Sequence, residues 1–186
     1  MIIYVRHGHD LVTSSQTKHD PEITEEGKEM ARKTARTLLK MYPVPKYIYI
    51  SPMRRVRQTY QQFRQVILDK TGQEVPGIAD GRLSRFFVGK EKKDPRIHSS
   101  TKKYNVPVEE TVEDMIERML DIHKENLVKH KGEVIWVISH GLTLKKLIDQ
   151  LGYNSPEHVD FLEYYIIATK GENIDDRLNK GISRLT

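Results

Sequence analysis

Residues 1–10, MIIYVRHGHD, contain an apolar run that leads directly into a cluster of charged and histidine side chains. Residues 2–6 predict a buried strand, because isoleucine, tyrosine and valine favour strands and show no helical periodicity here. Arg6 and His7 stand where this strand ends. Ligands of open α/β sheets bind at the carboxyl ends of strands, so this pair marks a candidate binding site.

The composition is that of one globular domain. The chain has 186 residues, of which 37% are hydrophobic and 31% charged. No apolar run approaches the roughly 20 residues that span a bilayer, so we expect a single domain over residues 1–186 with no membrane contact. Cysteine is absent, which excludes disulfides, thiol catalysis and thiolate metal sites. The first apolar run is too short for a signal peptide, so a cytoplasmic location is expected.

The remaining pattern alternates strands with helices. Ser51 and Pro52 follow the second strand as a capping residue and a proline at the first helical position. The predicted strands cover residues 2–6, 47–50, 134–138 and 161–169, and the predicted helices cover residues 24–42, 109–130, the stretch from residue 51 and the stretch from residue 141 to Gly152. This order predicts an α/β domain with a mostly parallel sheet. A basic surface excursion is expected at about residues 89–107.

Three strand ends carry polar side chains that suit an anion. The first delivers Arg6 and His7, the second is followed by Arg55 in the next helix, and the third delivers His140. Guanidinium groups bind phosphoryl oxygens in bidentate fashion, and helix N-termini add backbone N–H groups. The net charge of +5 also favours an anionic partner. A phosphorylated substrate is therefore expected, and nucleic acid is the less favoured alternative.

Five motifs in order resemble one family. They are Arg6-His7-Gly8, the stretch DPEITEEG at residues 20–27, SPMRRVRQT at residues 51–59, Glu110-Thr111 with Arg118, and ISHG at residues 138–141. Together they resemble the histidine phosphatase superfamily, which includes the cofactor-dependent phosphoglycerate mutases. The resemblance covers most of the chain, and it implies a three-layer αβα fold like that of phosphoglycerate mutase.

The resemblance also implies a mechanism without metal or cofactor. His7 attacks phosphorus and forms a phosphohistidine, which water then hydrolyses. Arg6, Arg55 and His140 hold the phosphoryl oxygens, and Gly141 and Thr13 lie at substrate-contacting positions. Thr13 stands where the family usually has asparagine, and a plain loop threonine is an equal alternative.

The sequence departs from the family at the proton donor. The main branch places an acidic glutamate in an L-x-E segment, and this chain has Arg85 there, while the other branch places an aspartate where this chain has Gly141. Arginine stays protonated at neutral pH and cannot serve as the acid. Three explanations stay open: Glu91 acts as a substitute donor, the substrates carry good leaving groups, or the chain binds phosphorylated ligands without turnover through Arg85.

The stretch from His7 to Asp10 also allows a metal hypothesis, because two histidines and a carboxylate are typical zinc ligands. No second histidine cluster with ligand spacing accompanies this stretch, which disfavours the hypothesis. His123 and His130 are expected to face solvent. We therefore expect a metal-independent phosphatase of phosphomonoesters, with a phosphate-binding pseudoenzyme and a phosphoglycerate-mutase-type phosphotransferase as alternatives.

Overall fold

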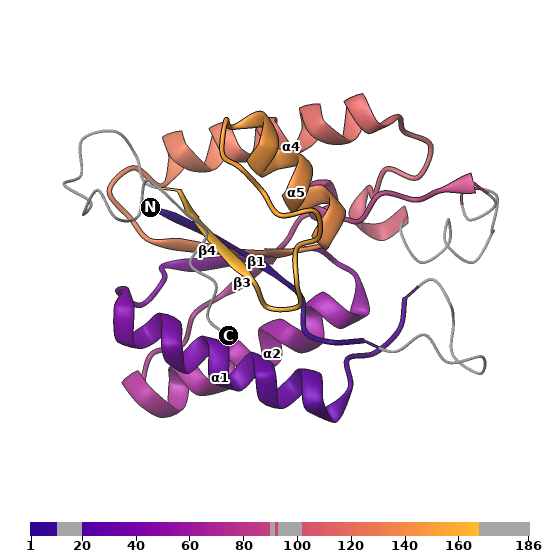
Figure 1. Cartoon of the computed structure of the whole chain (residues 1–186). Helices are drawn as coiled ribbons and strands as arrows, with labels where there is room; N and C mark the ends of the chain where they lie inside the picture. Colours follow the sequence, from indigo (N-terminus) through magenta and orange to yellow (C-terminus); the bar gives the residue numbers. More distant parts are fainter. Residues whose placement is uncertain (11–19, 90–91, 93–101, 168–186) are drawn as a thin grey trace.

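The computed structural model describes residues 1–10, 20–89, 92 and 102–167 (Figure 1). They form one sheet of five strands in the order β3-β2-β4-β1-β5. Adjacent strands of the sheet run parallel, except that β5 pairs with β1 in antiparallel fashion. The strands are β1 Ile2–Arg6, β2 Tyr47–Ile50, β3 Gly77–Ala79, β4 Ile135–Ser139 and β5 Tyr164–Ile167.

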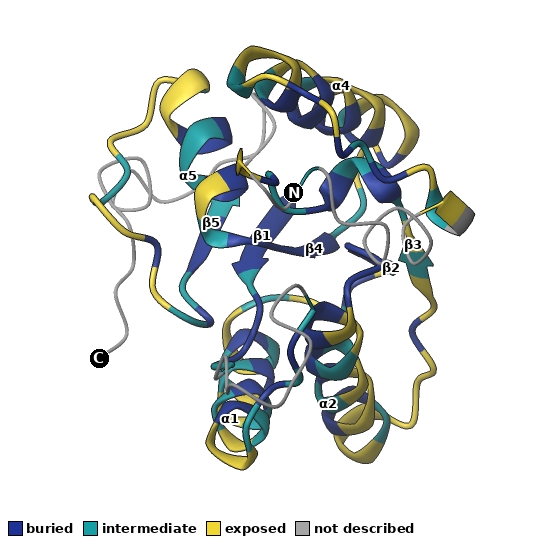
Figure 2. Cartoon of the chain, turned by 90° about the vertical axis from the view of Figure 1, so that its right-hand side faces the viewer, coloured by how far each residue is buried: buried dark blue, intermediate teal, exposed yellow. Residues whose placement is uncertain are grey.

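Helices cover both faces of the sheet. Helices α1 and α2 lie on one face, and α4 and α5 lie on the other (Figures 1 and 2). The helices are α1 Glu25–Met41, α2 Arg54–Thr71, α4 Val112–Lys129 and α5 Gly141–Gln150, with short 3-10 turns at Gly81–Leu83 and Lys102–Tyr104. The predicted three-layer αβα architecture with a mostly parallel sheet is confirmed.

The interior strand β1, between β4 and β5, shows why the layers form. Ile3 and Val5 belong to the core under α1 and α2, whereas Ile2 and Tyr4 belong to the core under α4 and α5. This split follows from the alternation of side chains along a strand. A strand that is apolar on both faces must be covered on both, so the run IIYV predicts a central position in a layered sheet.

Helix α1 begins as the sequence predicts. The Thr24 side chain accepts a hydrogen bond from the backbone of Gly27 at 2.9 Å, and Glu25 and Glu26 occupy the first turn. Both features stabilise the positive end of a helix. A Cβ at Gly27 would lie 2.4 Å from the backbone oxygen of His9. Only glycine therefore allows α1 to approach the loop that follows His7.

Several boundaries differ from the prediction. Helix α2 begins at Arg54, and its N-cap is Met53, so Pro52 does not occupy the first helical position. The last strand begins at Tyr164 rather than at residue 161. Strand β3, with three residues and an exposed glycine, was not predicted at all. Most of the basic excursion at about residues 89–107 lies outside the described residues.

His123 in α4 and His130 at the C-terminal end of this helix were predicted to face solvent, and this prediction is wrong. His123 is 4% exposed and its Nδ1 lies 2.8 Å from the hydroxyl of Tyr4. His130 is 6% exposed and its Nε2 lies 2.8 Å from the hydroxyl of Tyr49. Tyrosine hydroxyls on the sheet thus give both imidazoles buried polar partners. The sequence of α4 alone could not predict these partners, because they come from β1 and β2.

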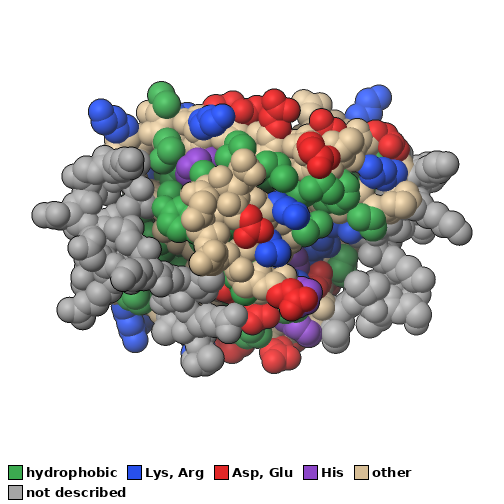
Figure 3. Space-filling view, turned by 45° about the horizontal axis from the view of Figure 1, so that its top comes forward, with side chains coloured by type: hydrophobic (Ala, Val, Ile, Leu, Met, Phe, Trp, Pro, Cys, Tyr) green, Lys and Arg blue, Asp and Glu red, His purple; other side chains and the backbone are tan. Residues whose placement is uncertain are grey.

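The outer surface shows mixed charge. On the face in Figure 3, Lys and Arg side chains lie among Asp and Glu side chains. Within the described part of the chain, no helix combines the length and the apolar character needed to traverse a bilayer.

Candidate active site

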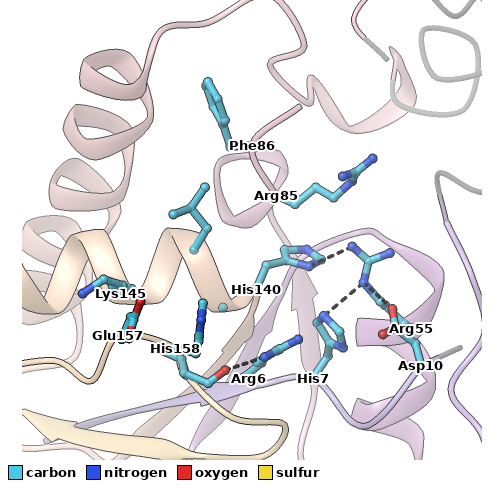
Figure 4. Close-up of a pocket in the computed structure, with 13 residues that line it drawn as sticks. Arg6, His7, Asp10, Arg55, Arg85, Phe86, His140, Lys145, Glu157 and His158 are labelled. Carbon is cyan, nitrogen blue, oxygen red and sulfur yellow. Dashed lines mark hydrogen bonds and ion pairs between the residues drawn. The ribbon is translucent and has the colours of Figure 1, made fainter. Parts of the chain in front are cut away.

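A cavity of about 380 Å³ opens at the carboxyl ends of the central strands (Figure 4). Arg6 ends β1 and His7 follows it, His140 follows β4, and Arg55 lies in the first turn of α2. All four line this one cavity. The convergence expected from three strand ends is therefore present in the structure.

His7 is held as a neutral imidazole with one nitrogen facing the cavity. Its Nδ1 lies 2.9 Å from the backbone oxygen of Gly8, an acceptor that requires a proton on this nitrogen. The other nitrogen, Nε2, then has a lone pair and accepts from Nε of Arg55 at 3.1 Å. Burial, reinforced by the Arg55 charge, holds the pKa of His7 well below its usual value. His7 therefore keeps an unprotonated Nε2, whose hydrogen-bond partner is Arg55.

Arg55 connects the two imidazoles. Besides His7, its guanidinium contacts Nδ1 of His140 through Nη2 at 3.2 Å. Its Nε also lies 3.4 Å from Oδ2 of Asp10. The arginine is 6% exposed, so this charge is held where water screens it little. Arg54 and Arg57, its neighbours in α2, are exposed as expected.

His140 is oriented from its other side by β2. Its Nε2 lies 2.9 Å from Oγ of Ser51. Because Arg55 donates to Nδ1, the His140 Nε2–H is the donor to the serine. Burial and the Arg55 charge lower the pKa of His140 well below its usual value. The sequence predicted Ser51 as a helix cap, whereas its oxygen is mainly the partner of this histidine.

Arg6 lies over an aromatic ring. Its guanidinium carbon is 3.8 Å from the centre of the Phe161 ring, and one Nη donates to the backbone oxygen of Val159. The Nε of Arg6 is buried without a hydrogen-bond partner. A Cβ at position 141 would lie 3.3 Å from that atom. Gly141 therefore makes room for Arg6. This close contact explains why the chain has glycine here, where the other branch of the family has aspartate.

Phe161 is a site residue that the sequence did not reveal. Its ring packs on His7 and His9 with centroid distances of 5.6 Å and 5.0 Å. It was placed in the last strand, but it lies in the turn before β5, next to Leu162 with a φ of 61°. A branched residue in this left-handed region is unusual, and no pattern in the sequence predicts it.

Arg85 lines the same cavity from a different element. Figure 4 shows it above His140 and Arg55, on the far side from Arg6. The segment before it is anchored, because Ser139 donates to the backbone oxygen of Leu83 at 2.7 Å. Arg118 donates to the backbone oxygen of Ser84 at 3.0 Å. Arg85 is thus carried by a fixed backbone.

Two predicted site residues, Thr13 and Glu91, lie outside the described residues. The metal hypothesis gains no geometric support in the described part of the chain, where no three metal-ligating side chains cluster. His9 contacts Oγ1 of Thr24 at 3.0 Å, and Asp10 pairs with Arg55.

Comparisons with known proteins agree with this architecture. The family model of the histidine phosphatase superfamily (branch 1) matches residues 2–166. The chain is 26% identical to a 2,3-bisphosphoglycerate-dependent phosphoglycerate mutase of Parvibaculum lavamentivorans, over 95% of this chain and 91% of that protein.

Solved structures show the same fold. YhfR of Bacillus stearothermophilus has a TM-score of 0.67 at 20% identity, with 91% of both chains covered. A mycobacterial glucosyl-3-phosphoglycerate phosphatase has a TM-score of 0.60 at 17% identity, with 88% of this chain and 87% of that chain covered. With its family model matched from the first strand to the last, the chain belongs to branch 1 of the histidine phosphatase superfamily.

Proposed function

We propose that the protein is a metal-independent phosphatase that hydrolyses a phosphomonoester through a phosphohistidine on His7. One observation carries this proposal: a neutral, buried His7, whose Nε2 accepts from Arg55, lines one cavity together with Arg6, Arg55 and His140. A nucleophilic nitrogen beside two guanidinium cations, those of Arg6 and Arg55, suits attack on a phosphoryl dianion.

The chemistry follows from these contacts. When the phosphoryl group enters, the Nε–H of Arg55 transfers its hydrogen bond from His7 to a phosphoryl oxygen, which frees the Nε2 lone pair. Arg6 holds another oxygen, and His140 positions the Arg55 guanidinium through its Nδ1. His140 can itself hold an oxygen only when its Nε2–H turns from Ser51 to the phosphoryl group. The arginines supply the positive charge that a metal ion supplies in other phosphoryl-transfer enzymes. Membership of the family, and phosphatases among the structures with the same fold, support the proposal.

Hydrolysis of p-nitrophenyl phosphate tests the proposal. We expect turnover by the wild type with or without EDTA, and a loss of at least about 10³-fold in His7→Ala, because the covalent route is removed. His9→Ala is the matched control, since His9 contacts Thr24 and does not line the cavity. It should keep most of the activity. A metal-dependent hydrolase would instead lose activity with EDTA, and with His9→Ala if His9 is a ligand.

Trapping the intermediate tests the mechanism. The reaction is stopped rapidly with a denaturant at alkaline pH, because phosphohistidine is labile in acid. Mass spectrometry should then find a phosphoryl group on His7. Turnover without such an adduct, in an enzyme that tolerates His7→Ala, would contradict the covalent mechanism.

The mutase alternative is favoured by one observation, the 26% identical mutase. A mutase would move the phosphoryl group between positions of phosphoglycerate and release little inorganic phosphate. Product analysis with 3-phosphoglycerate and 2,3-bisphosphoglycerate separates the two activities. The binding-protein alternative predicts a rise in melting temperature with phosphate and no turnover of any ester.

A further inference from the structure

The cavity has a cation, Arg85, on the side away from His7. In-line attack places the nucleophile and the leaving oxygen on opposite sides of phosphorus. In the view of Figure 4, His7 lies at the base of the cavity and Arg85 lies across it, beyond His140 and Arg55. Arg85 is close enough to these groups for its charge to contribute to lowering the pKa values of both Arg55 and His140.

The carboxylates that line the cavity lie elsewhere. They are Asp10 and Glu157 among the described residues. Asp10 contacts Arg55 on the side of the nucleophile, at 3.4 Å from Nε. Glu157 is exposed and lies beside Lys145 in Figure 4, away from His7. Neither lies beside Arg85 in Figure 4, so the charge that the described cavity lining presents on this side is that of Arg85.

The mouth of the cavity is partly apolar. Phe86 and Leu142 line it, and Leu142 is 46% exposed. Exposed apolar side chains beside a binding site favour contact with an apolar part of the ligand. The cavity thus presents cations to the phosphoryl group and apolar side chains to what is attached to it.

We infer that Arg85 stabilises the leaving oxygen as an anion, and that the enzyme selects phosphate esters of acidic hydroxyls, with aryl phosphates as the best-fitting class. This inference rests on the proposed function. A guanidinium cannot donate its proton at neutral pH, but it can stabilise a developing oxyanion. When neither Asp10 nor Glu157, the cavity-lining carboxylates of the described residues, donates a proton to the leaving oxygen, an alkoxide leaves slowly and a phenolate leaves readily, because a missing general acid costs about 10²–10⁴-fold.

The step is balanced without a further reactant. The Nε2 lone pair of His7 forms the N–P bond while the bond from phosphorus to the leaving oxygen breaks. The electron pair of that bond stays on the oxygen, which departs as an aryloxide beside Arg85 and takes its proton from water. Water then attacks phosphorus, loses a proton to solvent, and the N–P pair returns to His7.

A series of leaving groups tests the inference. We expect kcat/KM to rise steeply as the pKa of the leaving group falls, across substituted phenyl phosphates and alkyl phosphates. Phenyl phosphates should be preferred over alkyl phosphates by at least about 10²-fold, the cost of a missing acid. A shallow dependence in the wild type would overturn the inference even if hydrolysis requires His7, so its failure is distinct from that of the proposed function.

Two variants of Arg85 separate its possible roles. Arg85→Glu supplies an acid and should narrow the preference for phenyl over alkyl phosphates by at least about tenfold. Arg85→Gln removes the cation without supplying an acid, and should lower kcat for p-nitrophenyl phosphate by about 10²-fold. Arg57→Glu is the matched control, because it reverses an exposed charge of α2 outside the cavity, and it should change neither quantity.

Other outcomes contradict the inference in specific ways. If Arg85→Gln raises KM and weakens inhibition by inorganic phosphate but keeps the wild-type slope, Arg85 binds the phosphoryl group instead. If the wild-type dependence is shallow and becomes steep in Glu91→Gln, Glu91 is the proton donor. If no ester in the series is hydrolysed, the proposed function fails together with the inference.

Discussion

At the scale of single residues, Arg55 determines the geometry of the site. One guanidinium contacts Nε2 of His7, Nδ1 of His140 and a carboxylate oxygen of Asp10 at 3.1 Å, 3.2 Å and 3.4 Å. This arrangement uses the planar fork of arginine, which a lysine ammonium cannot reproduce. We therefore predict that Arg55→Lys lowers kcat/KM for p-nitrophenyl phosphate by about 10²–10³-fold.

The matched control for this prediction is Arg54→Lys, because Arg54 is exposed and precedes Arg55 in α2. Steady-state kinetics should show less than about a twofold change for the control. Circular dichroism should show the same fold for both variants. Full activity in Arg55→Lys would mean that charge alone suffices at this position and that the contacts to the imidazoles are incidental.

The sequence predicted some site residues better than others for physical reasons. Arg6, His7 and His140 follow apolar strands, so the topology alone brings them together. Phe161 joins them through a turn with an unusual φ at Leu162, which leaves no trace in hydrophobic patterning.

At the scale of secondary-structure elements, a buried ion pair holds the segment that carries Arg85. Arg118 of α4 and Glu110 are 9% and 4% exposed in their side chains, and they form paired contacts of 2.7 Å. Arg118 also donates to the backbone oxygens of Arg82 and Ser84. The pair thus links α4 to the 3-10 turn before Arg85.

We predict that Arg118→Met lowers the free energy of unfolding by about 3–5 kcal/mol, because it leaves a buried carboxylate and two carbonyl groups without a donor. Urea denaturation measures the change. The exposed pair of Arg64 and Glu74, 44% and 58% exposed, is the control. Arg64→Met should cost at most about 1 kcal/mol. Equal costs for the two variants would show that burial of the first pair has no consequence.

The strand order could be predicted only in part from these elements. The runs IIYV and IWVI are apolar on both faces, which predicts central strands, and β1 and β4 are indeed adjacent. Strand β3 has only three residues and gains its place by pairing with β2. Such a short edge strand depends on tertiary contacts rather than on its own sequence.

At the scale of the whole molecule, buried histidines couple folding to pH. Burial is the largest cause that lowers the pKa values of His7, His123 and His140 below the usual value of 6.5. In the unfolded chain these imidazoles titrate near that value. From about pH 6.5 downward the unfolded state therefore binds protons that the folded state does not. Stability must fall as the pH decreases through this range.

We predict that the free energy of unfolding, measured with urea, decreases from pH 7 to pH 5. Asp20 has the opposite effect on stability, because burial raises its pKa and the folded state therefore binds its proton more readily. The histidine contribution is obtained as the difference in slope between the wild type and each histidine variant. His7→Asn and His140→Asn should each flatten the dependence by up to about 1.4 kcal/mol per pH unit, the value for one proton. Val128→Ala is the control, because it changes an exposed side chain of α4 that carries no titratable group, and it should leave the slope unchanged. An unchanged slope in both His7→Asn and His140→Asn would mean that these histidines take up protons in the folded protein as they do in the unfolded chain, which would also remove the neutral nucleophile that the proposed mechanism requires.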